Sequence, residues 1–315
     1  MKEFEFISML RSKQENCRDL VLGIGDDAAV FAVSENKRVV VTTDLLVEHI
    51  HFAKDYTTPW LLGRKSLSVN LSDIAAMGAL PRFFLFDIAL PKNWSDSVES
   101  FVEGLLSVAK EYDVRLIGGD TCASKRDLFI GITVIGECER GKFVARNGAG
   151  EGDLICVTGK LGASAYGLKL LKSGKRIQSA MADYERAAIK AHLDPVPRVW
   201  LGRALAEIAT AMIDISDGLS SELVHICCES SVGCRLELDR LPVAEGATLE
   251  DALNGGEDYE LLFTLPEQKL SCLDRLRSYG VELTVIGSIT GTLDRKMIKN
   301  GEELQLLPGG YEHFS

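Results

Sequence analysis

The chain has 315 residues, of which 46% are hydrophobic and 26% are charged, and its formal net charge is −11 at pH 7. This length accommodates two domains of ordinary size, and the composition is typical of a globular protein. The acidic balance disfavours nucleic acid and anionic membranes as partners, because both would repel the protein.

The sequence also indicates a cytoplasmic protein. Its longest apolar runs, such as residues 83–90, are too short to span a bilayer. Residues 1–5 carry acids where a secretory signal has a basic start and a long apolar stretch. The eight cysteines form no CxxC pair and lie mostly in apolar stretches, which is typical of reduced core residues.

The first half of the chain alternates apolar runs with segments of helical periodicity. The β-branched run 39–43 predicts a strand with Asp44 at its far end. Residues 59–77 have helical character. The positions Leu62, Ser66, Val69/Asn70, Asp73 and Met77 recur at three- to four-residue spacing, which puts Asn70 and Asp73 on one face of the predicted helix. We expect Ser95 to cap a helix that runs to about Glu111. The other expected strands are residues 20–25, 28–33, 82–90, 114–117 and 128–135.

Four glycines between residues 141 and 152 mark the predicted domain boundary, which divides the chain into residues 1–140 and 141–315. Beyond it, we expect strands at residues 153–158, 211–215, 261–265 and 281–286, and helices at residues 163–171, 199–209 and from about 216 onward. Strands and helices alternate in both halves, so the predicted fold class is mixed α/β.

Aspartates stand repeatedly at the ends of apolar runs. The five motifs are Gly25-Asp26-Asp27, Thr42-Thr43-Asp44, Asn70-Leu71-Ser72-Asp73, Gly118-Gly119-Asp120-Thr121 and Asp214-Ile215-Ser216-Asp217-Gly218. Neighbouring carboxylates repel, and an unpaired buried carboxylate is costly, so we expect a cation to gather them. Oxygen ligands suit Mg²⁺, and bound metal would also let an acidic protein accept anionic phosphates. The motifs therefore predict a magnesium-dependent enzyme that acts on a phosphate.

Two familiar nucleotide-binding motifs do not explain the sequence. Residues 23–28 formally fit a dinucleotide fingerprint, but a strand-like run follows where a helix is needed. Asp26 and Asp27 would also lie where a pyrophosphate needs backbone amides. The chain has no GxxxxGK[ST] motif, so phosphates must be held by metals and other groups.

Three further motifs leave alternatives open. Asp217 could be a metal ligand or could help cap the next helix. The pair His49-x-His51 could bind zinc, or could face the surface or a substrate, and strand alternation would put both side chains on one side. Arg146 could be a solvated charge, or could contact a nucleotide phosphate or base.

Together these motifs resemble the thiamine-monophosphate kinase family. The matching stretches follow the family's order over nearly the whole chain: residues 23–29 (GIGDDAA), 42–44 with 51–52, 69–78 (VNLSDIAAMG), 116–121 (LIGGDT), 146–153, 214–219 (DISDGL), 255–263 (GGEDYELLF) and 310–314. The first and sixth also occur in the wider superfamily of aminoimidazole ribonucleotide synthetase and selenophosphate synthetase. The stretch NLSDIAAMGA, the stretch GGEDYEL and the closing residues 311–314 are more particular to the thiamine enzymes.

The resemblance implies ATP-dependent phosphorylation of thiamine monophosphate to thiamine diphosphate. It implies a two-domain aminoimidazole ribonucleotide synthetase-like fold and a homodimer, with N-terminal strands of two chains closing a shared barrel. Residues 1–140 would form the ATP- and metal-binding, dimerising domain, and residues 141–315 would complete the substrate site. One departure is Glu103, where some relatives have a tyrosine near the nucleotide.

The resemblance also implies the site residues. Several Mg²⁺ ions would be held by Asp27, Thr42, Thr43, Asp44, Asp73, Asp120, Asp214 and Asp217. ATP would contact Gly119, Asp120, Arg146 and Ser216, and the thiamine substrate would lie near His51, Glu257 and Tyr311.

Two other functions stay open at this point. One is a sibling ATP-dependent enzyme acting on another small molecule, although Cys17 lacks the glycine-rich setting of a selenophosphate synthetase. The other is a non-catalytic metal- and nucleotide-binding protein. For the kinase, the acceptor is already a phosphate, so the chemistry needs positioning and charge neutralisation more than a general base, and we expect direct in-line transfer.

Overall fold

The computed structural model describes residues 9–10, 12–13, 20–22, 30–31 and 33–312. The chain divides into two compact units, Met1–Ile74 with Ala79–Gly141, and Ala75–Gly78 with Lys142–Ser315. Asp27, Cys17 and the motif at residues 23–29 lie outside the described residues, as do residues 313–314. No described helix has the length and apolar character needed to cross a membrane.

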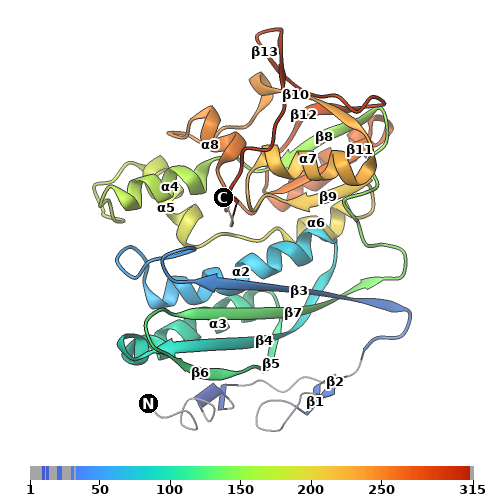
Figure 1. Cartoon of the computed structure of the whole chain (residues 1–315). Coiled ribbons are helices and arrows are strands. Elements are labelled where there is room, and N and C mark those ends of the chain that lie inside the picture. The colour runs from blue at the N-terminus through green and yellow to red at the C-terminus, as the bar shows by residue number, and fades with distance from the viewer. Residues whose placement is uncertain (1–8, 11, 14–19, 23–29, 32, 313–315) are drawn as a thin grey trace. The chain divides into compact units, whose positions relative to one another are not determined.

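In the described part of the first unit, coloured blue to green in Figure 1, two long helices pack on one face of the main sheet, and β1 and β2 form a separate pair. Its strands are β1 (Leu20–Leu22), β2 (Val30–Phe31), β3 (Lys37–Val47), β4 (Leu80–Pro91), β5 (Arg115–Gly118), β6 (Thr121–Ser124) and β7 (Phe129–Glu139). Its helices are α2 (Pro59–Ala76) and α3 (Val98–Glu111), with the 3₁₀ helix η1 (Lys92–Ser97) before α3.

The main sheet of this unit has the order β3-β7-β4-β5, with β6 also paired to β4. Strand β7 is antiparallel to both β3 and β4, whereas β5 and β6 are parallel to β4. Among the described residues the sheet is open, and the barrel shared across a dimer stays a prediction.

Alternation along the strands explains which face carries the core. Ile130, Ile132 and Val134 of β7 are buried, as are Phe84 and Phe86 of β4. The other face is different at the edge strand, because Val39, Val41 and Leu45 of β3 are 45%, 60% and 58% exposed. The first unit therefore has one buried and one partly apolar, exposed sheet face.

Asp44 and Ser95 do not lie at the element ends that the sequence predicted, and the helix expected at 199–209 ends at Leu205. Strand β3 continues to Val47, so Asp44 lies inside it instead of at its end, because residues 37–47 all pair with β7. Ser95 does not cap α3, because it lies within η1 and its hydroxyl donates to the Lys92 carbonyl at 2.9 Å. Helix α3 begins only after Ser97.

The second unit, coloured yellow-green to red in Figure 1, is a larger mixed sheet with helices. Its strands are β8 (Asp153–Thr158), β9 (Ala211–Asp214), β10 (Gly233–Glu237), β11 (Leu261–Pro266), β12 (Leu283–Thr290), β13 (Arg295–Lys299) and β14 (Glu302–Gln305). Its α-helices are α4 (Ala163–Lys172), α5 (Asp183–Leu193), α6 (Val199–Leu205), α7 (Leu219–Ser230), α8 (Leu249–Asn254) and α9 (Leu273–Leu276). Short 3₁₀ helices are η2 (Leu238–Arg240), η3 (Glu267–Cys272) and η4 (Arg277–Tyr279).

The seven strands of this unit have the order β14-β13-β10-β12-β8-β11-β9. Only the β10–β13 pair is parallel among these neighbours, and the others are antiparallel. Buried residues of β8, β9 and β11 share a core with α7, whose Leu219, Leu223 and Ile226 are fully buried. This packing fixes the turn between β9 and α7, which carries the Asp214–Gly218 motif.

Helices α2 and α3 approach so closely that glycine is required at their contact. A Cβ atom on Gly63 would lie 2.0 Å from the Phe101 carbonyl oxygen, and one on Gly104 would lie 1.9 Å from the Trp60 carbonyl oxygen. Both distances are far inside van der Waals contact, and both obstacles are backbone atoms. The two helices can pack this way only without side chains at these positions.

We therefore expect Gly104→Ala to destabilise the first unit. Alanine normally gains about 1 kcal/mol over glycine in a helix, but overpacking of this kind costs about 1–3 kcal/mol or more. Urea unfolding followed by tryptophan fluorescence measures the difference, because Trp60 and Trp94 lie in this unit. Gly150→Ala is the control, since its Cβ would meet only Asp153 Oδ2 at 3.8 Å. Equal or greater stability of Gly104→Ala would contradict this packing.

Candidate functional site

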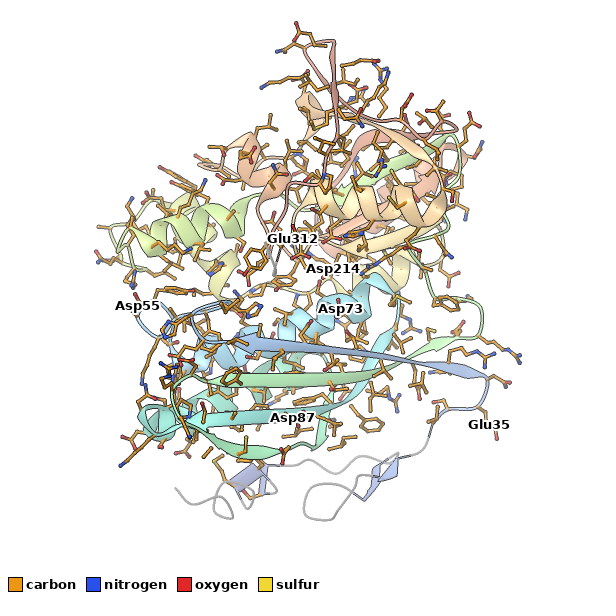
Figure 2. The ribbon with its side chains drawn as sticks, in the orientation of Figure 1. Glu35, Asp55, Asp73, Asp87, Asp214 and Glu312 are labelled. Atoms are coloured by element: carbon orange, nitrogen blue, oxygen red, sulfur yellow. The ribbon has the colours of Figure 1, made fainter. Side chains whose placement is uncertain are left out.

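In the first unit, the inner face of β3 and the helix α2 bring three of the expected ligands together. Thr42 and Asp44 are two residues apart on β3 and so share one face. The Thr42 hydroxyl donates a short hydrogen bond to Asp73 Oδ2, which projects from α2 (Figure 2). Three oxygen-bearing side chains from two elements therefore form a cluster of hard donors.

The electrostatics of this cluster disfavour the ionised form of Asp44. Burial, together with the negative charge of Asp73, raises the pKa of Asp44 from 3.8 to about 7. Asp44 is thus easier to protonate than an ordinary aspartate, because its charged form lacks compensation. A cation between Asp44 and Asp73 would offset the Asp73 charge and favour the ionised form of Asp44.

Thr43 points the other way. Its hydroxyl donates to the Ile132 carbonyl at 3.1 Å and lies 2.9 Å from the hydroxyl of Thr133, both on β7. Strand alternation explains this, because neighbouring residues on β3 face opposite sides. The described contacts do not join Thr43 to Asp44 and Asp73, so its role as a metal ligand stays a prediction.

Gly119 and Asp120 form the turn between β5 and β6. Gly119 has a φ of +153°, and a Cβ atom there would lie 1.8 Å from the Phe86 carbonyl oxygen, so only glycine fits. The Asp120 backbone N–H donates to Asp87 Oδ1 at 2.7 Å, and the Ile88 N–H donates to the Asp120 carbonyl at 2.9 Å. Asp120 and Asp87 are both exposed.

Asp87 is a functional candidate that sequence reasoning missed. It is labelled on β4 in Figure 2 and pairs across the sheet with Gly131. A Cβ atom at Gly131 would lie 3.3 Å from the Asp87 Cβ, so Gly131 leaves room for this acid. The signal was a single charge within the apolar run 83–90.

The two histidines lie after the end of β3, so strand alternation does not determine where their side chains point. The strand ends at Val47, and His49 adopts a positive φ of +69° in the turn that follows. The Val47 N–H donates to His51 Nδ1 at 3.0 Å, so Nδ1 is an acceptor. His49 lies beside Glu48 and Asp127, with ligand atoms of the three side chains within 4.8 Å of one another.

Glu48 is already well bonded. Its carboxylate is buried and accepts from the Trp94 indole N–H at 3.2 Å and from the Leu128 N–H at 2.9 Å. These bonds explain why an acid is tolerated there.

A surface pocket of about 350 Å³ lies between α3 and β5. It is lined by Lys13, Glu103, Leu106, Ser107, Ala109, Lys110, Val114, Arg115 and Leu116. Its volume is within the range of small-molecule sites. Glu103, which departs from the family pattern, thus forms part of its wall.

In the second unit, the turn after β9 carries the other acidic motif. Asp214 is buried and pairs with Leu261 of β11 at the end of β9 (Figure 2). Helix α7 begins after Gly218, which is its N-cap residue with a φ of +130°. Neither Ser216 nor Asp217 therefore caps this helix.

A buried acid supports this turn from the first part of α7. Glu222 Oε1 accepts from the Ser216 hydroxyl at 3.3 Å and from the Asp217 N–H at 3.2 Å. Burial raises the pKa of Glu222, and the Asp217 charge adds to the rise, whereas the Asp217 N–H bond and the charges of His225 and Arg146 oppose it. Glu222 was missed in the sequence, although an acid early in a helix after an Asp-rich motif is a usable signal.

Arg146 lies near Glu222. Its charge acts on Glu222, and its backbone carbonyl accepts from the Ser230 hydroxyl of α7 at 3.0 Å. The side chain is exposed. A guanidinium thus lies near the turn that carries Ser216 and Asp217.

Two segments that are distant in the sequence bind to this turn through the backbone N–H groups of Glu257 and Tyr311. The Glu257 N–H donates to the Ser216 carbonyl at 2.7 Å, and the Tyr311 N–H donates to the Asp217 carbonyl at 3.1 Å. Tyr311 is 53% exposed. The structure thus brings Asp214, Ser216 and Asp217 together with the two residues expected to bind the substrate.

The segment that carries Glu257 is held in an unusual conformation. Glu257 and Tyr259 have positive φ angles of +66° and +51°, which side chains rarely adopt. Asp258 accepts from the backbone N–H groups of Gly162 and Ser164 at 2.6 and 3.1 Å, and burial raises its pKa to about 7. Glu260 is bound in turn by the Arg198 guanidinium, whose Nε donates at 2.7 Å.

The comparisons with known proteins agree with this architecture. Residues 25–138 match the N-terminal domain, and residues 150–298 the C-terminal domain, of AIR synthase related protein. The chain is 40% identical to thiamine-monophosphate kinase of Escherichia coli (strain K12), over 99% of this chain and 98% of that protein.

Solved structures are similar over nearly the full length. Thiamine-monophosphate kinase from Stenotrophomonas maltophilia K279a has a TM-score of 0.87 at 36% identity, covering 96% of this chain and 98% of that one. AaThiL complexed with AMPPCP and TMP has a TM-score of 0.79 at 32% identity, covering 99% and 97%. These findings confirm the expected two-domain mixed α/β fold. The chain belongs to the AIR synthase related proteins and, within them, to the thiamine-monophosphate kinase family.

Proposed function

We propose that this chain transfers the γ-phosphoryl group of ATP to thiamine monophosphate, giving thiamine diphosphate and ADP. The observation that carries the proposal is the attachment of Glu257 and Tyr311 to the Ser216–Asp217 turn. This attachment places an acid and an aromatic ring, which both attract a cationic ring system, beside a turn rich in oxygen atoms that could bind a metal. The AaThiL complex with AMPPCP, an analogue of ATP, and TMP supports the same pair of substrates.

The residues fit the Mg²⁺ ions that such a transfer requires. In the first unit Thr42, Asp44 and Asp73 offer only oxygen atoms, and the raised pKa of Asp44 reports uncompensated negative charge. We assign Asp214 and Asp217 the same role in the second unit. Asp27, Thr43 and Asp120 complete the proposed set. Bound Mg²⁺ would supply charge neutralisation for the two polyanionic phosphates and for the transferring group.

The chain's own side chains would do the positioning. Arg146 would pair with nucleotide phosphate through its planar guanidinium. Ser216, Gly119 and Asp120 are the other proposed ATP contacts. The acceptor phosphate oxygen is already a nucleophile at neutral pH, so no residue needs to remove a proton from it. In-line transfer then follows from holding the two phosphates in place.

The remaining groups would bind the organic parts of the substrates. The pocket of about 350 Å³ beside Glu103 and Arg115 has room for a purine base. Glu257 would face the cationic thiazolium ring of thiamine, Tyr311 would stack on a ring, and His51 would complete the acceptor site.

We further propose a cytoplasmic homodimer. The exposed Val39, Val41 and Leu45 form an apolar stripe on β3, and exposed apolar edge strands are typical of interfaces. The seven described cysteines are free thiols, which supports a reducing compartment.

We expect ATP consumption to require thiamine monophosphate, with thiamine diphosphate formed in equal amount. Free thiamine should be a poor acceptor, because it lacks the attacking phosphate oxygen and the oxygen atoms that would share the metals. Chromatographic separation of thiamine, its monophosphate and its diphosphate measures this, with an aminoimidazole ribonucleotide precursor as the comparison substrate. Comparable turnover of the precursor would favour a sibling enzyme, and binding without turnover would favour a non-catalytic protein.

We expect the free energy of unfolding of the wild type to fall as the pH rises, and we expect Asp44→Asn to remove this fall. Between pH 3.8 and about 7 the folded state holds a proton on Asp44 that the unfolded chain lacks, so the free energy of unfolding falls as the pH rises. The slope for one such proton is about 1.4 kcal/mol per pH unit. The variant should therefore gain stability over the wild type from pH 5 to pH 8 in denaturant titrations without Mg²⁺.

Added Mg²⁺ should stabilise the wild type more at pH 8 than at pH 5.5, because it binds the deprotonated carboxylate. Glu35→Gln, on an exposed turn before β3, is the control and should leave the pH profile unchanged. The metal assignment fails if Mg²⁺ stabilises wild type and Asp44→Asn equally at pH 8.

We expect Val41→Glu to produce monomers. The side chain is 60% exposed in the isolated chain, and a buried glutamate pair across an interface would be repulsive. Sedimentation velocity measures the mass. Leu293→Glu, at a residue that is 71% exposed in the second unit, should remain dimeric. A monomeric wild type, or a dimeric Val41→Glu, would contradict the proposed interface.

A further inference from the structure

A buried histidine, His192, contacts the carboxylate of Glu257, which is a proposed substrate-binding residue. His192 lies near the end of α5 and is 2% exposed. Its Nδ1 is 3.2 Å from Glu257 Oε2 and 3.0 Å from the hydroxyl oxygen of Ser164, at the start of α4. The imidazole therefore joins two helices to the segment that carries Glu257.

The contact fixes where the proton lies. An ionised carboxylate only accepts hydrogen bonds, so Nδ1 must carry the hydrogen for this contact to be favourable. Ser164 Oγ can then accept from the same N–H. This arrangement orients the ring and gives Glu257 Oε2 a fixed donor, much as neighbouring hydrogen bonds orient the ligands of a metal.

The segment around Glu257 has other anchors, so it does not need His192 to hold its backbone. Asp258 binds two backbone N–H groups at the start of α4, and Glu260 binds Arg198. The Glu257 N–H itself donates to Ser216. What these anchors do not fix is the Glu257 side chain, which has three rotatable torsions and is 22% exposed.

We propose that His192 is a positioning residue that holds the Glu257 carboxylate toward the cationic part of the acceptor substrate. The inference rests on the proposed function, in which Glu257 faces the thiazolium ring. His192 would touch neither substrate. It would lower the cost of ordering Glu257 when the acceptor binds, and so would act on acceptor affinity and not on ATP.

The test compares two substitutions of His192. His192→Asn keeps an N–H donor near the Nδ1 position but removes the rest of the ring, whereas His192→Leu keeps the bulk and removes the donor. We expect His192→Leu to raise the KM for thiamine monophosphate about tenfold, the typical effect of losing a hydrogen bond to a charged group. The KM for ATP should change little, and His192→Asn should recover most of the lost affinity.

A double substitution tests whether His192 acts through Glu257. Glu257→Gln should itself raise the KM for thiamine monophosphate, and adding His192→Leu should raise it no further, because the two residues form one unit. Ser164→Ala is the matched control, since it removes the other partner of Nδ1 and leaves Glu257 in contact. It should keep the wild-type KM for the acceptor. Melting temperatures are measured for every variant.

The outcomes separate the inference from the function. If the wild type neither binds nor phosphorylates thiamine monophosphate, the proposed function fails. If the wild type is active and His192→Leu keeps its acceptor KM, only the positioning role is wrong. The positioning role is also wrong if His192→Leu and His192→Asn both raise the two KM values in parallel and lower the melting temperature. Additive effects of His192→Leu and Glu257→Gln on the acceptor KM would overturn it too. Either result would indicate a structural role for His192.

Discussion

Three consecutive carbonyl oxygens organise the second unit's part of the site. Those of Ile215, Ser216 and Asp217 accept from the backbone N–H groups of Tyr259, Glu257 and Tyr311, at 2.9, 2.7 and 3.1 Å. Backbone groups that are shielded from water need such partners, so the turn and the segments bound to it must form together. The contacts depend on backbone atoms, so they set the path of the turn and of the two segments whatever the side chains bind.

The acids of the two units are tolerated in different ways. Asp258 and Glu222 are supported by backbone N–H groups, which offset part of the cost of burial. Asp44 has the Asp73 charge beside it, and both influences on its pKa act upward. Backbone N–H groups thus favour the ionised forms of Asp258 and Glu222, whereas burial and the neighbouring charge both disfavour the ionised form of Asp44.

The sequence predicted well what depends on burial alone. The apolar runs became β4, β7, β8 and β11, because a buried strand needs such a run whatever its partners are. It predicted poorly what depends on pairing. Strand β14 is exposed and β13 is mostly polar, and β13 is paired with β10 and β14, which no apolar run in the sequence signals. The position of Asp44 inside β3 likewise depends on β7.

The site followed the same rule. Motifs and the family resemblance predicted part of it. They pointed to Thr42, Asp44 and Asp73 in the first unit. In the second unit they pointed to Glu257, Tyr311 and the Ser216–Asp217 turn. His192, Glu222 and Asp87 were missed, because their roles come from contacts with residues distant in the chain or across a turn. A histidine near the end of a helix gives no pattern until its neighbours are known.

The left-handed backbone at Glu257 and Tyr259 has an evolutionary consequence. Glycine would adopt these φ angles without strain, so glycine at either position would relieve the local backbone at the expense of a functional or packed side chain. Selection for thermal robustness and selection for activity therefore oppose each other at these positions. In a library screened only for folding, we would look for glycine to accumulate there, and its exclusion under selection for growth would identify the residues whose side chains the organism needs.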